Sequence, residues 1–200
     1  NDLFDAIAAN CTAGRNPTAR QKVDFNRMFS NRPGKFKYSR EVMEWSIRCM
    51  DQVPKAPDKS TRKNFEKQLL SHIRNNPQIK FDLFLPPYSI YFWCFQKKLG
   101  HLDEYCALRN YLAEEIEKLP NAVLHDFQAE WDIVCNLDNY KDITHYSPAI
   151  NSEILRKIHS GKYISSGIQV KKSTNLIRKK LEEYDAAFLS LYGNKPSRKK

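Results

Sequence analysis

Two apolar segments in the middle of the chain have the character of buried strands, and they constrain the fold more than any other feature. The first, KFDLFLPP at 80–87, ends in a double proline that cannot continue a hydrogen-bonded ladder. The second is NAVLHDF at 121–127, and the residues between the two segments have helical spacing. Strands joined through a helical crossover run parallel, and helices cover both faces of such a sheet. The sequence therefore predicts an α/β fold with a parallel sheet.

Hydrophobic residues at helical spacing predict the remaining elements. In the clearest of these helices, Ser147 is the N-cap, Pro148 is the first helical residue and Gly161 is the stop. The other predicted helices cover 18–29, 39–53, a segment from Ser60 to the NNPQ stop at 75–78, 88–99 with Gly100 as its stop, a segment with Leu108, Leu112, Ile116 and Leu119 on one face, and about 173–193.

The chain shows no internal repeat, so it is expected to form one domain with appended segments. We divide it into a poorly defined helical and loop segment at 1–59, an α/β core at 60–170 and an amphipathic helix with a basic tail at 171–200. Hydrophobic residues make up 41% of the 200 residues, which is enough to bury a core. No run of eighteen apolar residues occurs, so no transmembrane segment is expected.

The five cysteines do not have the spacing of a structural zinc site. They contain no CxxC pair and no paired spacing against histidine. We interpret them as small buried hydrophobic residues, and their odd number leaves the redox compartment open. We expect neither a metal nor a cofactor.

The loop at 137–147 follows the second predicted strand and carries Asp142 three residues before His145. In parallel sheets, reactive groups gather beyond the carboxyl ends of the strands. An aspartate at this spacing can turn its carboxylate to Nδ1 of the imidazole and leave Nε2 free as a base. We therefore predict Asp142 and His145 as the catalytic acid and base of an acyl-transfer site.

Two other interpretations of this loop remain open. Asp142 could cap backbone amides beside a structural histidine. A metal could instead be held by Asp138, Asp142 and His145, with or without Asp126, since carboxylate oxygens suit Mg, Ca or Mn. No HxH or HExxH spacing supports such a site. No role is assigned to the other histidines, which are His72, His101, His125 and His159.

Three segments in order, FDLFLPPYSIYFW, NAVLHDFQ and LDNYKDITHYSPAIN, resemble the carboxyl-terminal half of SGNH (GDSL-like) hydrolases. They are most similar to the envelope-associated branch that includes DltD-like and alginate-acetylation-like proteins. The resemblance covers roughly residues 60–160. It implies a flavodoxin-like three-layer α/β/α fold, Asp142 as the orienting acid and His145 as the general base. It also implies an acylated carbohydrate or envelope polymer as substrate, and a periplasmic or cell-surface location.

The chain departs from this family at the nucleophile. No GDS and no GxSxG motif occurs, and Ser147 is too close to His145 in sequence for a normal proton transfer. Ser89, Ser165 and Ser166 are available hydroxyls without a supporting motif. We therefore expect the serine and the oxyanion donors to lie outside this chain, so that the amino-terminal part of the domain is incomplete. The alternative is a divergent or inactive member of the family.

A second class of function is a non-catalytic binding module for polyanions. The formal net charge is +10, and from residue 153 to 200 twelve Lys and Arg stand against four Asp and Glu. Such a basic region can bind nucleic acid, an anionic glycan or a lipid surface. However, the aromatic residues of the last helix follow core spacing, which does not favour stacking on bases. Nucleic acid is therefore a less favoured partner.

Overall fold

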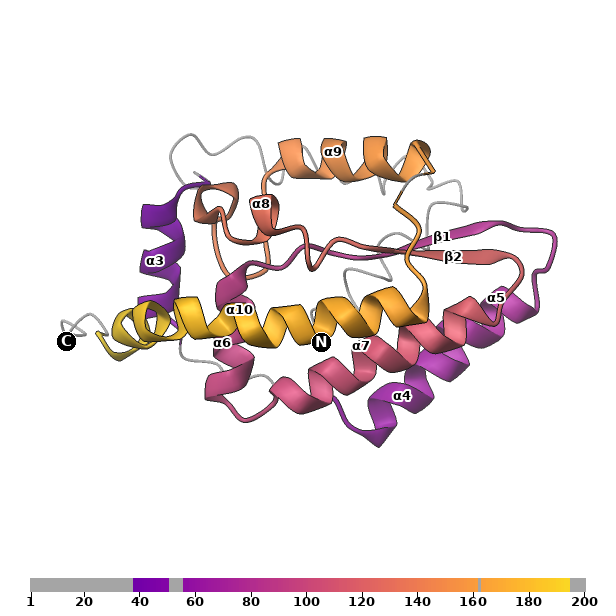
Figure 1. The fold of residues 1–200 in the computed structure, drawn as a ribbon, viewed down its shortest axis with the longest axis horizontal. Coiled ribbons are helices and arrows are strands. Elements are labelled where there is room, and N and C mark those ends of the chain that lie inside the picture. Colours follow the sequence, from indigo (N-terminus) through magenta and orange to yellow (C-terminus); the bar gives the residue numbers. More distant parts are fainter. Residues whose placement is uncertain (1–37, 51–55, 162, 195–200) are drawn as a thin grey trace, which may run out of the picture. The chain divides into compact units, whose positions relative to one another are not determined.

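The two apolar segments form neighbouring parallel strands, β1 (Phe81–Leu85) and β2 (Ala122–Asp126), as Figure 1 shows. The structure is a computed structural model that describes residues 38–50, 56–161 and 163–194. The register pairs Phe81 with Ala122 and continues to Leu85 with Asp126. The predicted α/β class with a parallel sheet is confirmed, and the sheet has two strands in the part of the chain described.

The helices, in chain order, follow from local sequence signals of capping and periodicity. They are α3 (Arg40–Arg48), α4 (Lys59–Phe65), the π-helical turn η1 (Glu66–Leu70), α5 (Ser71–Arg74), α6 (Ile90–Lys98), α7 (Leu102–Glu117), α8 (Trp131–Val134), the 3-10 turn η2 (Leu137–Asn139), α9 (Pro148–His159) and α10 (Gly167–Gly193).

Helices lie on both sides of the strands. α6 and α7 form the crossover between β1 and β2, and α7 contacts β2 while α10 packs against α6 and α7. On the other side, α9 buries Ile150 and Ile154 in a cluster with Phe127 and Ile133, against which Phe84 of β1 packs. Figure 1 shows α9 on one side of the strands and α7 with α10 on the other. Two strands do not by themselves establish a flavodoxin-like sheet.

Two helix boundaries differ from the sequence predictions. α3 ends at Arg48 and not near residue 53. α10 begins at Gly167, several residues before the predicted start near Ser173, because Ser166 and Gln169 form a capping box in which each side chain bonds the other's backbone N–H. The expected boundary at 170/171 thus falls inside α10. The helix predicted at 18–29 lies outside the described residues.

α9 has the predicted start and stop. Ser147 is its N-cap, Pro148 its first residue, and Gly161 follows its end with φ +64°, a left-handed conformation that glycine adopts at little cost. This start fixes the direction in which the preceding loop enters the helix. His145 lies in that loop, two residues before the N-cap Ser147.

None of the helices in the described ranges is both long and apolar enough for a membrane span. Of the cysteines described, Cys94 and Cys106 are buried free thiols, and burial raises the pKa of each. Cys135 is half-buried and Cys49 is exposed. The interpretation of cysteines as buried hydrophobic residues is therefore confirmed for Cys94 and Cys106 and wrong for Cys49.

Candidate functional site

The loop that carries the predicted site is a small closed hairpin beyond the carboxyl end of β2. Tyr140 and Tyr146 form an isolated antiparallel bridge, and the Lys141 amide donates to the His145 carbonyl at 3.1 Å. At the open end of the hairpin, the Ser147 amide donates to the Asn139 carbonyl at 2.8 Å. The hairpin has a defined backbone, so its side chains are held in fixed directions.

Asp142 and His145 contact each other across this hairpin. Nδ1 of His145 lies 2.7 Å from Oδ2 and 2.9 Å from Oδ1 of Asp142. Oδ1 also accepts the backbone amide of His145 at 2.8 Å and that of Thr144 at 3.0 Å. The carboxylate therefore both caps two backbone amides and holds the ring, so the capping interpretation and the orienting interpretation describe the same contact.

The exposure of the pair leaves the second ring nitrogen accessible. The side chain of His145 is 58% exposed and that of Asp142 is 33% exposed. Within the described residues, the hydrogen bonds of the His145 ring are made through Nδ1. An imidazole that donates from Nδ1 to a carboxylate presents Nε2 as a lone-pair base. General-base catalysis needs such a ring nitrogen and, in addition, a nucleophile within hydrogen-bond reach of it.

Burial raises the pKa of Asp142, but hydrogen bonds from His145 and Thr144 and the charge of His145 outweigh burial and lower the pKa below its ordinary 3.8. A carboxyl group with a lowered folded pKa adds stability above its unfolded pKa and loses it as the pH falls through the folded value.

We therefore expect the difference in melting temperature between the wild type and Asp142→Asn to be larger at about pH 5 than at about pH 3, because a protonated aspartate resembles asparagine. Thermal unfolding of both proteins from pH 2.5 to 7 measures it. A difference that grows as the pH falls would contradict the ionised contact.

Two segments anchor the hairpin from outside. The backbone amide of Ser39 donates to the Tyr140 carbonyl at 3.1 Å, just before α3. The segment after β1 contributes Ser89, whose amide and hydroxyl donate to the Ile143 carbonyl, and Pro87, whose carbonyl accepts the Tyr140 hydroxyl at 2.6 Å. These anchors join residues far apart in the sequence, and sequence periodicity carried no signal for them.

The alternative metal site is not assembled. Asp138 accepts the Arg40 backbone amide at 2.7 Å and so caps the start of α3, while Asp126 forms a buried ion pair with Arg109. Within the described ranges, no three His, Cys, Asp or Glu residues come together as metal ligands. The proposed use of Asp126 and Asp138 as ligands beside Asp142 and His145 is therefore wrong.

His125 forms a second histidine–aspartate contact that cannot serve as a base. Its ring is 1% exposed on β2, with Nε2 3.1 Å from Asp82 Oδ1 and Nδ1 3.1 Å from the Tyr163 carbonyl. Both ring nitrogens are engaged, so no lone pair is free for chemistry. The comparison shows what sets His145 apart: one engaged nitrogen and an exposed ring.

Arg109 of α7 is a buried charged residue that the sequence analysis did not identify. It is 3% exposed and forms an ion pair with Asp126 at the end of β2. Its Nε donates to Gln128 Oε1 at 2.8 Å, and Ser173 and Thr174 of α10 accept further bonds. These contacts tie α7, β2 and α10 together, which makes Arg109 a structural residue.

The serines considered as nucleophiles have structural contacts. Ser89 is fully buried, Ser165 accepts the Asp126 amide at 3.3 Å, and Ser166 caps α10. Within the described residues, the hydrogen bonds of the His145 ring go to Asp142 and Thr144 and not to these three hydroxyls.

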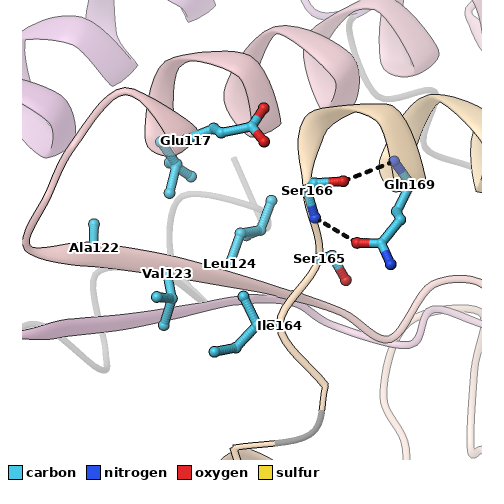
Figure 2. Close-up of a pocket in the computed structure, with 9 residues that line it drawn as sticks. Glu117, Ala122, Val123, Leu124, Ile164, Ser165, Ser166 and Gln169 are labelled. Atoms are coloured by element: carbon cyan, nitrogen blue, oxygen red, sulfur yellow. Dashed lines mark hydrogen bonds between the residues drawn. The ribbon is translucent and has the colours of Figure 1, made fainter.

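A groove of about 270 Å³ lies apart from the histidine, along the first half of β2 (Figure 2). Figure 2 shows Ser166 and Gln169 bonded to each other there, and the Glu117 carboxylate accepts the Gly167 amide at 3.1 Å. The polar groups of the groove are thus occupied in capping α10. Its lining residues are Ile116, Glu117, Ala122, Val123, Leu124, Ile164, Ser165, Ser166 and Gln169.

The basic residues of α10 are partly neutralised. Lys171 pairs with Glu114 at 2.5 Å, Arg178 with Asp103 at 2.6 Å, and Lys180 with Glu183 at 2.6 Å. The apolar residues of the helix are core, since Ile177, Leu181 and Phe188 are buried. The basic tail at 195–200 lies outside the described residues. These contacts give no specific support to a polyanion-binding surface.

Comparison of the chain with protein-family models, with curated proteins and with solved structures gave no match.

Proposed function

We propose that the chain carries the acid and base of an SGNH-type acyl-ester hydrolase or O-acyltransferase. One observation supports this above all: the carboxylate of Asp142 lies 2.7 Å from Nδ1 of an exposed imidazole beyond the end of a parallel strand. A serine supplied from outside these 200 residues would attack the acyl carbonyl. His145 would take the serine proton at Nε2 and return it to the leaving oxygen, while Asp142 stabilises the imidazolium.

The acceptor of the acyl group separates the two activities within this proposal. Water as acceptor gives an esterase, and a sugar hydroxyl gives a transferase. The resemblance to envelope-associated SGNH proteins favours an acylated carbohydrate or envelope polymer, a flavodoxin-like arrangement of the completed sheet and an extracytoplasmic location. These points stand on the resemblance alone.

Covalent labelling of the natural full-length polypeptide tests the proposal. A fluorophosphonate should label one serine, and His145→Ala should abolish both labelling and hydrolysis of p-nitrophenyl acetate, because the serine then has no base. His159→Ala is the matched control, since His159 is exposed on α9 and its ring hydrogen-bonds the Leu155 carbonyl of its own helix at 2.7 Å. Equal labelling of the wild type and His145→Ala would remove the proposed role of His145.

A further inference from the structure

Ser89 has an unusual use for a residue at the start of a helix. It occupies the N-cap position of α6, yet its hydroxyl makes no hydrogen bond to the helix. The hydroxyl instead donates to the Ile143 carbonyl at 2.9 Å, and the Ser89 backbone amide donates to the same oxygen at 3.1 Å. Ser89 is fully buried, so these two bonds are shielded from water.

The acceptor of these bonds lies inside the catalytic hairpin. A carbonyl oxygen has two lone pairs, and the donors on Ser89 take both. The same peptide unit presents the Thr144 amide on its other side, and this amide donates to Asp142 Oδ1 at 3.0 Å. The peptide between Ile143 and Thr144 is therefore held at its oxygen by Ser89 and at its nitrogen by Asp142. Rotation of this plane would move the carboxylate that holds the His145 ring.

A second contact from the same segment supports the first. The Tyr140 hydroxyl, from a fully buried side chain, donates to the Pro87 carbonyl at 2.6 Å. Burial raises the pKa of Tyr140, so its hydroxyl keeps the proton that it donates. Two consecutive prolines stiffen the segment that receives this bond, because the ring of each fixes its φ angle.

We propose that Ser89 is a positioning residue for the catalytic pair: through the Ile143–Thr144 peptide it sets the direction of the Asp142 carboxylate and thereby of the His145 ring. The expected effect of Ser89 on the reaction rate rests on the proposed acyl chemistry. The expected effect on the tautomer of the His145 ring does not, and it can be measured without any turnover.

The test measures two properties of Ser89→Ala, Ser89→Thr and Tyr140→Phe in the natural full-length polypeptide. The first is kcat and KM for p-nitrophenyl acetate. The second is the ¹⁵N chemical shifts of the His145 ring, which report whether Nδ1 carries the proton. Ile116→Val is the control, because Ile116 is buried in α7 away from the hairpin.

Ser89→Ala should lower kcat by about 10- to 100-fold with KM unchanged, since a small displacement of a catalytic group costs this much. The ring shifts should move toward a mixture of tautomers, and Tyr140→Phe should change both properties in the same direction. Ser89→Thr, which keeps the hydroxyl, should restore the wild-type ring shifts and most of kcat. Ile116→Val should leave both unchanged.

The proposal is overturned if Ser89→Ala and Ile116→Val behave alike, or if the ring shifts of Ser89→Ala equal those of the wild type. If Ser89→Ala does not fold, Ser89→Gly, which removes the same hydroxyl at a helix N-cap that tolerates glycine, decides by the same criteria. If the wild type hydrolyses no ester, the proposed function fails, and the ring shifts alone decide whether Ser89 positions the pair.

Discussion

Asp142→Asn should lower kcat for ester hydrolysis by about 10³- to 10⁴-fold, with little change in KM, because it reverses the tautomer of His145. The backbone amides of Thr144 and His145 both point at Oδ1, so the oxygen of an asparagine remains there. The NH₂ group then takes the place of Oδ2, 2.7 Å from Nδ1. This shorter contact of Nδ1 then meets an N–H donor, which favours the tautomer in which Nδ1 accepts and Nε2 carries the ring proton, and in that tautomer the base is lost.

Asp138→Asn is the matched control for this variant. Asp138 belongs to the same loop and accepts one backbone amide, from Arg40, and an asparagine oxygen can accept that bond equally well. We expect its kcat to stay within about threefold of the wild type, as for a surface change that keeps its hydrogen bond. Steady-state kinetics at a saturating ester concentration compare the two. If Asp142→Asn retained a tenth or more of the activity, the carboxylate of Asp142 would not be what sets the tautomer of His145.

Arg109→Met should destabilise the protein by about 3–5 kcal/mol, because it leaves the Asp126 carboxylate buried without its partner. The side chains of Arg109 and Asp126 are 3% and 5% exposed, so water cannot replace the lost cation. Urea unfolding followed by circular dichroism gives the change in free energy. Combining the change with Asp126→Leu should recover part of the loss, since the unpaired charge is then gone as well.

Arg178→Met is the control for the buried pair. Arg178 also joins α10 to α7, through Asp103, but these side chains are 42% and 81% exposed. A pair of this kind contributes about 0–1 kcal/mol. Equal losses in Arg109→Met and Arg178→Met would show that burial of the Arg109 pair does not matter.

The sequence predicted the elements whose signals are local. The start of α9 depends on Ser147 and Pro148, and its stop on Gly161, all within one segment. The contact of Asp142 with His145 spans three residues of one loop and was also predicted. In each case the interacting groups are close in sequence, so that residue type and spacing are sufficient information.

The parts that could not be predicted depend on pairs that are distant in sequence. Arg109 occupies a position on α7 next to the apolar stripe, where arginine is usually solvated, and its partner Asp126 is 17 residues away. The hydroxyl of Ser89 reaches Ile143 across 54 residues. No periodicity encodes such pairs, because they are set by how the strands and helices pack.

The hydrogen-bond donors around Asp142 limit where a proton taken up by His145 can go. One carboxylate oxygen already receives two backbone amides and the Thr144 hydroxyl, at 3.2 Å for the latter, and the other faces the ring. A carboxylate with this many donors does not readily take up a proton. A proton that His145 accepts at Nε2 is therefore not passed on through Nδ1 to Asp142. The proton must leave from Nε2, the nitrogen that accepted it. The attacking serine oxygen and the leaving oxygen therefore both lie on the Nε2 side of the ring.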